Sequence, residues 1–494
     1  MQINLSTRSM ADYELFLKIK ELPCYKFHGR TADFPDQYAD RIMGKAIAIA
    51  DVEYEPADFL FDYQKAIAAM AITKRKFAIF ADCGLGKTFI YAEFMRHCHK
   101  VLDAGKAILI VCPLMVVGQT IEEFASRYGD ALPLEHVAAK DLAAWTELGG
   151  RFGITNFEAL GDHVSRGRLG ALIVDESSML KSHYGKWGNE IIRLGRGLEW
   201  KLAGTGTPAP NDRIEYANHA VFLDAAPNVN AFLARYFVNR GQKVERWSIK
   251  AHALGAFYRG LSHWSIFLTN PATYGWKDHA ADIPPIHVHI EHVPLAASQQ
   301  EAIQETTGQL LVSQLGGIGM RSKVGQISKG RHNGEAIETH KPQYILDLVS
   351  SWPTEQTIIW CLYNAEQEKV AAMFPSDTIA NITGATPLPE RMRLIGEFKA
   401  GRLRTIITKP KILGFGLNLQ CATRQVFSGL QDSYEQYYQA VKRSNRVGST
   451  RPLNVHIPVT DAEYPMIETV LSKAARVQQD TEQQERIFHA STTL

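Results

Sequence analysis

The stretch ADCGLGKT, residues 81–88, lies between the apolar segment KFAIF and the apolar, helix-like segment FIYAEFM. A buried strand, a glycine-containing loop and a helix in this order form a phosphate-binding loop, because the N–H groups at a helix start point at an anion. We predict that Lys87 reaches the terminal phosphates of a nucleotide and that the Thr88 hydroxyl ligates Mg²⁺. The predicted nucleotide-binding residues of the loop are Cys83, Gly84, Leu85, Gly86, Lys87 and Thr88.

A pair of adjacent carboxylates follows farther along the chain. The segment ALIVDESSMLKS places Asp175 and Glu176 directly after a short apolar run that is typical of a strand. Strand ends of a parallel sheet face the ligand crevice. We predict that Asp175 holds Mg²⁺ and that Glu176 polarises the water that attacks the γ-phosphate, which suits hydrolysis. Taken alone, the pair is equally consistent with an exposed acidic turn, and only the phosphate loop favours the catalytic interpretation.

Short apolar strands alternate with helix-like segments in two regions of the chain. The strand candidates are residues 77–80, 107–111, 171–174 and 202–204 in the first region, and 357–362, 404–407, 424–427 and 454–458 in the second. Parallel strands need crossover helices, so this pattern predicts an α/β fold with two tandem parallel-sheet lobes. The predicted domains are a small N-terminal accessory element (1–45), a first, ATP-binding lobe (46–225), a helical insertion and interlobe linker (226–335) and a second lobe (336–494).

The composition limits the class of protein. The chain has 494 residues, of which 45% are hydrophobic and 21% charged, with a net charge of +2. These values fit several globular domains and do not by themselves indicate a nucleic-acid partner. We find no apolar run of about 18 residues and no secretory leader. The six cysteines form no CxxC pair, so we expect a cytoplasmic protein without a disulfide framework or zinc site.

Several blocks, taken in order, resemble the motor core of superfamily-two helicases and translocases, and most of all its Swi/Snf-type branch. In that family the second motif usually reads DEAH or a close variant, whereas Ser177 and Ser178 replace the last pair here. The compact chain suggests a phage or mobile-element member. The matching blocks are YQ (63–64), ADCGLGKT (81–88), IVCPLMVVGQTIEEF (110–124), ITNFE (154–158), VDESS (174–178), TGTPAPN (205–211), WCLYNAEQE (360–368), NITGATPLPERMRLIGEFKAG (381–401), ILGFGLNLQ (412–420) and QAVKRSNRVGS (439–449).

The resemblance implies two RecA-like lobes and adds residues to the nucleotide site. A Gln amide both donates and accepts, so Gln64 could read the adenine edge. Arg443 and Arg446 are spaced to share one helix face, from which two guanidiniums can clamp the γ-phosphate. Since they lie on the second lobe, hydrolysis would require the lobes to close, which couples ATP to movement. The residues added by the resemblance are Tyr63, Gln64, Gly416, Gln439, Arg443 and Arg446.

The resemblance also implies a track for one nucleic-acid strand. Hydroxyl and N–H groups suit phosphate contacts that ignore base sequence, and the matching positions are Pro113, Thr155, Asn156, Thr383, Gly384 and Thr408. Basic residues could line the same track: Lys181, Arg321, Lys323, Lys329 and Arg331. Five aromatic residues could stack on bases, although such residues more often form core: Trp247, Phe257, Tyr258, Trp264 and Phe267.

We predict an ATP hydrolase that is stimulated by nucleic acid and uses ATP and Mg²⁺. The leading hypothesis is a DNA helicase or translocase that moves on duplex or branched DNA in replication, recombination or repair. One alternative is an RNA helicase. Another is a nucleotide-switched binding protein with little motor activity, against which the presence of Glu176, Arg443 and Arg446 argues. No nuclease residues are evident, so cutting would need a nuclease or recombination partner.

Overall fold

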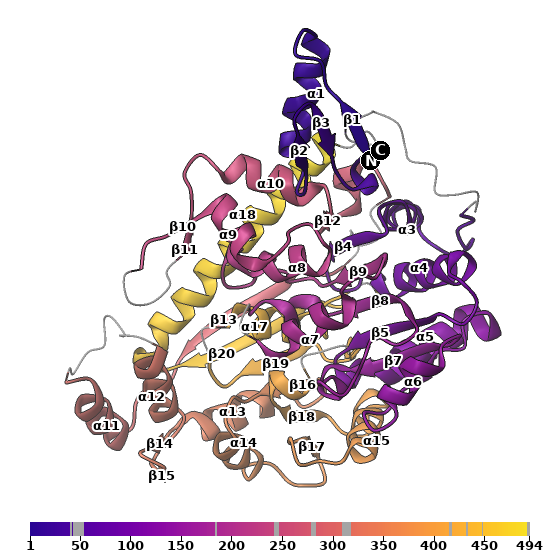
Figure 1. Cartoon of the computed structure of the whole chain (residues 1–494). Coiled ribbons are helices and arrows are strands. Elements are labelled where there is room, and N and C mark those ends of the chain that lie inside the picture. The colour runs from indigo at the N-terminus through magenta and orange to yellow at the C-terminus, as the bar shows by residue number, and fades with distance from the viewer. Residues whose placement is uncertain are drawn as a thin grey trace. The chain divides into compact units, whose positions relative to one another are not determined.

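Two compact units make up the chain. The computed structural model describes residues 1–39, 42, 54–182, 185–241, 247–277, 283–308, 318–413, 417–430, 433–446 and 448–491. One unit comprises residues 1–279 with 477–494, and the other comprises residues 280–476. Each unit is built around one parallel sheet (Figure 1), so the predicted α/β class with two parallel-sheet lobes is confirmed.

The sheet of the first unit has seven strands, and every neighbouring pair in it is parallel. Its inner strands are near-continuous apolar runs, AILIVC in β5 and LGALIVD in β8, as expected where both faces of a sheet are buried. In spatial order the strands are β12 (Ser265–Leu268), β4 (Lys76–Ala81), β9 (Trp200–Gly204), β8 (Leu169–Asp175), β5 (Ala107–Cys112), β7 (Phe152–Asn156) and β6 (Glu135–His136).

Helices cover this sheet. Helix α4 packs against β5, β8 and β9, and α5 packs against β6 and β7. The helices are α3 (Asp62–Lys74), α4 (Lys87–Val101), α5 (Val117–Tyr128), α6 (Leu142–Leu148), α7 (Lys186–Gly195), α8 (Tyr216–Phe222), α9 (Val229–Tyr236) and α10 (Leu254–Ser262). A hairpin of β10 (Phe237–Asn239) and β11 (Trp247–Ile249) follows α9. Four aromatic candidates for base stacking, Phe257, Tyr258, Trp264 and Phe267, are buried, so the alternative interpretation as core is the correct one for them.

The N-terminal element is a small antiparallel sheet with one helix. It consists of β1 (Gln2–Asn4), α1 (Met10–Glu21), β2 (Lys26–His28) and β3 (Thr31–Asp33), with β3 in the middle of the sheet. The guanidinium of Arg235, on α9, donates to the carbonyl oxygens of residues 20, 21, 22 and 23 at 2.9–3.3 Å. A cation at the carbonyl end of a helix is favourable, so Arg235 anchors α1 to the first unit.

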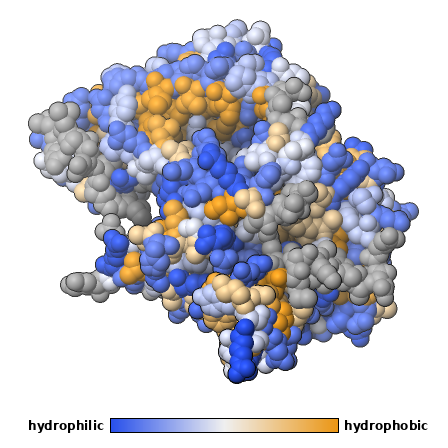
Figure 2. All heavy atoms as spheres, turned by 90° about the horizontal axis from the view of Figure 1, so that it is seen from above, coloured by the Kyte–Doolittle hydropathy of each residue, from blue (hydrophilic) through white to orange (hydrophobic). Residues whose placement is uncertain are grey.

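The surface carries few large apolar side chains in any one element. The face seen from above in Figure 2 is mostly hydrophilic, with apolar residues gathered in separate patches. Within α1, Met10 and Tyr13 are 71% and 53% exposed. Leu17 of the same helix is 45% exposed, and its spacing from Met10 and Tyr13 places the three on one face of α1.

The sheet of the second unit has six strands, again all parallel. In spatial order they are β13 (Ile286–His292), β20 (Leu453–Val459), β19 (Arg424–Phe427), β16 (Thr357–Trp360), β18 (Thr405–Thr408) and β17 (Ile379–Asn381). The helices are α11 (Ala297–Thr307), α12 (Ile318–Ser328), α13 (Lys341–Ser350), α14 (Asn364–Ala371), α15 (Leu388–Lys399), α16 (Pro410–Leu413) and α17 (Tyr434–Val441). A short hairpin joins β14 (Arg331–His332) to β15 (Glu335–Ala336).

Residues 226–335, which we expected to form an insertion and linker, contribute to both sheets. They supply β12 to the first sheet and β13 to the second, and the boundary between the units falls inside them. The last helix, α18 (Tyr464–Ser491), begins in the second unit, and its residues from 477 onward belong to the first. Among the described residues no helix is both long and apolar enough to cross a membrane.

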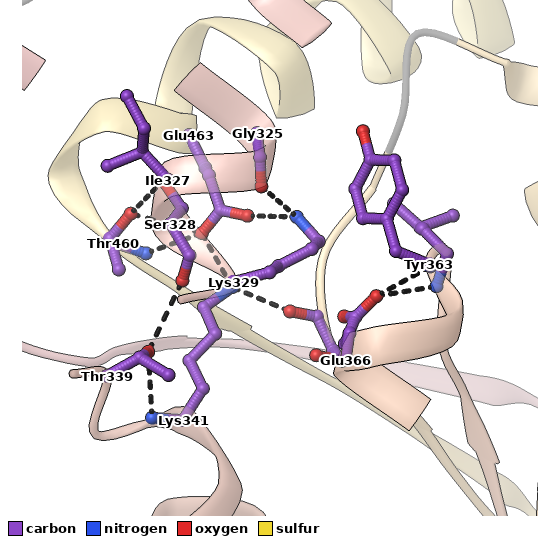
Figure 3. A network of polar contacts seen from close by, with 12 residues as sticks. Gly325, Ile327, Ser328, Lys329, Thr339, Lys341, Tyr363, Glu366, Thr460 and Glu463 are labelled. Atoms are coloured by element: carbon purple, nitrogen blue, oxygen red, sulfur yellow. Dashed lines mark hydrogen bonds and ion pairs between the residues drawn. The ribbon is translucent and has the colours of Figure 1, made fainter. Parts of the chain in front are cut away.

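A buried ion cluster holds α12 and α13 in the second unit (Figure 3). The Nζ of Lys329, just after α12, lies 2.7 Å from Oε1 of Glu463, and the Nζ of Lys341 lies 2.6 Å from its Oε2. All three side chains are at most 2% exposed. Burial would raise the pKa of Glu463, but the two ammonium groups outweigh burial and lower that pKa to about 2. Lys329, which we predicted among residues lining the nucleic-acid track, is therefore a structural residue, and that prediction is wrong.

Candidate nucleotide site

Three neighbouring strands of the first sheet carry the predicted chemical groups at their carboxyl ends. Strand β4 leads into the loop 81–88, β8 ends at Asp175, and β9, which lies between them, leads into Thr205. The carboxyl ends of parallel strands form the ligand crevice of such a sheet. Segments that are far apart in the sequence are thereby brought to one edge.

The loop 81–88 has the backbone of an anion cradle. Gly84 and Gly86 have φ of +87° and +68°, values that favour glycine. Gly86 is the residue immediately before α4, whose first residue is Lys87. The N–H groups at the start of this 15-residue helix are thus directed into the loop, as phosphate binding requires.

The Lys87 ammonium lies inside the loop. Its Nζ donates to the carbonyl oxygens of Ala81 at 2.8 Å and Asp82 at 3.2 Å. Hydrogen bonds from an ammonium to charged phosphate oxygens are stronger than those to neutral carbonyls. Lys87 can therefore exchange these partners for the terminal phosphates of a nucleotide.

Tyr63 and Gln64 lie against the loop. The Tyr63 hydroxyl donates to the carbonyl of Leu85 at 3.1 Å, and Gln64 Nε2 donates to the same oxygen at 3.3 Å. Gln64 Oε1 accepts from the N–H of Phe61 at 3.0 Å. Both side chains are buried, at 2% and 3% exposure, so they hold the loop in position.

Phe61 is a candidate that sequence reasoning missed. Its ring is 39% exposed and stacks on Tyr63, with centroids 5.8 Å apart and an angle of 27° between the planes. An exposed aromatic face beside a phosphate loop can stack on a base. The signal in the sequence was an aromatic residue two positions before the Tyr63–Gln64 pair.

Asp175 is a partly buried carboxylate next to a second one, Glu176. The hydroxyl of Tyr91, on α4, donates to its Oδ1 at 2.9 Å. Burial, followed by the charge of Glu176, raises the pKa of Asp175 to about 6, while Lys87 acts in the opposite direction. A divalent cation stabilises an ionised ligand, so the Asp175 carboxylate fits Mg²⁺.

Glu176 has an unusual backbone and a defined side-chain contact. Its φ of +50° lies in the left-handed region, which non-glycine residues occupy only at a cost. Its Oε2 accepts from Thr205 Oγ1 at 3.2 Å, and Thr205 Oγ1 accepts from the N–H of Thr207 at 3.2 Å. The side chain is 7% exposed. The TGTPAPN segment (205–211) is thus in direct contact, through Thr205, with the carboxylate predicted to polarise water.

The QAVKRSNRVGS segment (439–449) begins in the last turn of α17 and continues beyond it, in the second unit. The prediction that Arg443 and Arg446 share a helix face is wrong, because α17 ends at Val441. Arg443 is buried, and its Nε donates to the carbonyl of Gln439 at 2.9 Å. Arg446 is partly exposed, and its N–H donates to Ser449 Oγ at 3.2 Å. Gly416 lies outside the described residues.

The nucleic-acid candidates differ in accessibility. Thr155 and Thr408 are fully buried, and their hydroxyls donate to the carbonyls of Val137 at 2.7 Å and Ile382 at 3.0 Å. Accessible surface remains at Pro113, Asn156, Thr383 and Gly384. Hydroxyl contacts to phosphate are therefore more readily made at Thr383 than at the two buried threonines.

Two family models match the chain, one on each sheet. Residues 59–184 match the model described as type III restriction enzyme, res subunit, and residues 340–448 match the helicase conserved C-terminal domain. These ranges contain the phosphate loop and acidic pair in the first unit, and residues 439–448 of the QAVKRSNRVGS segment in the second. The two matches, one in each unit, support the resemblance to superfamily-two helicases and translocases.

Comparison with solved structures finds a match to the Sulfolobus solfataricus SWI2/SNF2 ATPase core in complex with dsDNA. The match covers 88% of this chain and 97% of that chain, with 17% identity and a TM-score of 0.39. Comparison with curated protein sequences finds no match.

Proposed function

We propose that the protein is an ATP hydrolase that couples ATP turnover to movement on DNA. One observation supports the proposal most strongly. The phosphate loop, the TGT segment and the acidic pair follow the carboxyl ends of the neighbouring strands β4, β9 and β8, and Thr205 contacts Glu176. A protein that only switches on ATP binding has no need of a buried carboxylate aimed by a second motif. The alternative of a nucleotide-switched binding protein is therefore less favoured.

We infer the following roles for the chain's residues. The N–H groups of the loop and Lys87 bind phosphate oxygens, and Gly84 and Gly86 allow the close approach. Asp175 and Thr88 would hold Mg²⁺, which neutralises phosphate charge when bound. Glu176 orients the attacking water and accepts its hydrogen bond, in a position fixed by Thr205.

We propose that turnover also needs the second unit, through Gln439, Arg443 and Arg446. An arginine that meets the phosphate charge in the transition state accelerates hydrolysis by on the order of 10³-fold or more. A requirement for residues of both units makes each turnover depend on a conformational change, which is the basis of directed movement.

We assign the substrate to duplex or branched DNA and the protein to the Swi/Snf-type branch of the superfamily. The support is the ordered set of motifs, including RSNRVGS at residues 443–449. RNA is the alternative substrate.

We also propose the domain boundaries 1–45, 46–225, 226–335 and 336–494. We further propose a cytoplasmic location, which the six free cysteines favour.

ATP turnover by the full chain should be measured with no nucleic acid, single-stranded DNA, blunt duplex, forked or four-way DNA, and RNA. We expect duplex or branched DNA to stimulate turnover most strongly. Stimulation by RNA alone would overturn the substrate assignment and leave the nucleotide site intact. Equal turnover under all conditions would contradict the motor.

A further inference from the structure

Two consecutive residues of α8, Asn218 and His219, form hydrogen bonds with the turn that follows Glu176. Glu176 precedes a short 3₁₀ turn, Ser177–Leu180, and its own φ of +50° is unfavourable for a residue with a side chain. A strained backbone persists only where neighbouring groups fix it. The contacts of this turn therefore decide where the Glu176 carboxylate points.

His219 fixes the beginning of the turn. Its Nε2 lies 3.0 Å from Ser177 Oγ, and its Nδ1 lies 3.4 Å from the carbonyl oxygen of Glu215. A hydroxyl can donate or accept, so Ser177 Oγ can bond Nε2 in either tautomer of the ring. The imidazole is fully buried, and burial lowers the pKa of His219 to about 4, so the ring is neutral.

His219 also contacts the strand that leads into the phosphate loop. Its ring packs edge-on against Phe80 of β4, with centroids 5.3 Å apart and an angle of 89°. Phe80 is followed directly by Ala81, the first residue of the loop. The His219 imidazole thus contacts both the turn after Glu176, at Ser177, and the strand that leads into the phosphate loop, at Phe80.

Asn218 fixes the end of the same turn. Its Nδ2 donates to the carbonyl of Leu180 at 2.6 Å and to that of Ser182 at 2.9 Å. Space for this amide depends on Gly188 of α7, where an added Cβ would lie 2.8 Å from Nδ2. Asn218 is 1% exposed, so these bonds are shielded from water.

We infer that Asn218 and His219 are positioning residues for ATP hydrolysis, with the Ser177–His219 hydrogen bond setting the orientation of Glu176. The inference rests on the proposed function, in which Glu176 orients water. It also gives a role to Ser177, at one of the two positions where the second motif departs from the usual spelling.

The test compares Ser177→Ala with Ser178→Ala in the full chain. The Ser178 hydroxyl is equally buried but has no hydrogen-bond partner among the described residues, which makes it a matched control. We expect Ser177→Ala to lower kcat by about tenfold, the effect of a 1.4 kcal/mol loss. The affinity for a non-hydrolysable ATP analogue should stay unchanged, and Ser178→Ala should keep wild-type kcat.

A double-mutant cycle with His219→Phe completes the test. If the bond is the source of the effect, Ser177→Ala, His219→Phe and the double variant should share one reduced kcat. Multiplying losses, equal losses in Ser177→Ala and Ser178→Ala, or wild-type kcat in Ser177→Ala would each overturn the positioning role. If His219→Phe does not fold, the two serine variants still decide.

The variant Glu176→Gln distinguishes a failure of the proposed function from a failure of the positioning role alone. Wild-type turnover in this variant would overturn the proposed hydrolytic role of Glu176 and the inference with it. Loss of turnover in Glu176→Gln together with wild-type turnover in Ser177→Ala would overturn only the inference.

Discussion

Thr205 Oγ1 donates a hydrogen bond to Glu176 Oε2 at 3.2 Å, joining the segment after β9 to the segment after β8. The same hydroxyl accepts from the N–H of Thr207. A shift of the TGT segment therefore changes the hydrogen bonding of the carboxylate predicted to orient water. This contact gives a physical route by which the TGTPAPN segment (205–211) could influence the proposed ATP hydrolysis.

Lys87→Ala should abolish ATP turnover, because the loop loses the only charge of residues 81–88 that attracts phosphate. The variant should be measured by phosphate release at saturating ATP and DNA. Lys100→Ala, an exposed lysine on the same helix, is the matched control and should turn over normally. Wild-type hydrolysis in Lys87→Ala would contradict the assignment of the nucleotide site.

Arg446→Ala should retain ATP binding and lose most turnover, on the order of 10³-fold, because its proposed role is to meet charge that develops in the transition state. Nucleotide affinity and kcat should be measured separately. Arg451→Ala removes an exposed arginine nearby in the chain and should have little effect. If the two variants have equal kcat, Arg446 is not the catalytic arginine.

Gly86→Ala should impair nucleotide binding. Its φ of +68° disfavours alanine, and the new Cβ would lie 2.2 Å from Gln64 Nε2, which must then release the Leu85 carbonyl. We expect weaker binding of ATP, measured by titration with a fluorescent analogue. Gly118→Ala, at a helical position where a Cβ meets nothing within 4 Å, should bind ATP as the wild type does. Equal binding by both variants would show that the loop tolerates the side chain.

Glu463→Gln should destabilise the second unit by about 3–5 kcal/mol, because Lys329 and Lys341 would remain buried without the carboxylate that both contact. Urea unfolding measures this loss, and Glu301→Gln, an exposed position, is the control. The pKa of Glu463 is lowered from 4.5 to about 2 in the folded chain, so its contribution is complete above pH 4.5. The difference between wild type and Glu463→Gln should shrink as pH falls from 4.5 toward 2. A difference independent of pH in that range would show that the ion cluster is not its source.

The sequence predicted the strands that carry the site because their signals are local. The run ALIV before Asp175 and the run KFAIF before the phosphate loop each lie within one strand, β8 and β4. Strand β12 gave no comparable signal, because its identity depends on pairing of Ser265 with Ala78, far away in the chain. Edge pairing of this kind is decided by tertiary structure.

The sequence motifs of the site could be predicted, whereas the residues that position them could not. Residue type and spacing alone indicate a phosphate site at residues 81–88 and a metal site at residues 175–176. The contact of His219 with Ser177 could not be predicted, since an imidazole in a helix has no sequence signature of its partner. The helical pattern from Gln439 to Arg446 was also misleading, because the backbone leaves the helix after Val441 despite suitable spacing.

The membership of residues 477–494 in the first unit has a consequence for biosynthesis. Asp480 accepts from Arg213 Nε at 3.0 Å and from the Tyr258 hydroxyl at 3.0 Å, and Glu485 accepts from the hydroxyl of Thr269 at 2.7 Å. A ribosome makes these acceptors after the whole of residues 280–476. The unit whose residues are translated first is therefore the last to receive all of its parts, and the second unit can finish folding before the nascent chain completes the first.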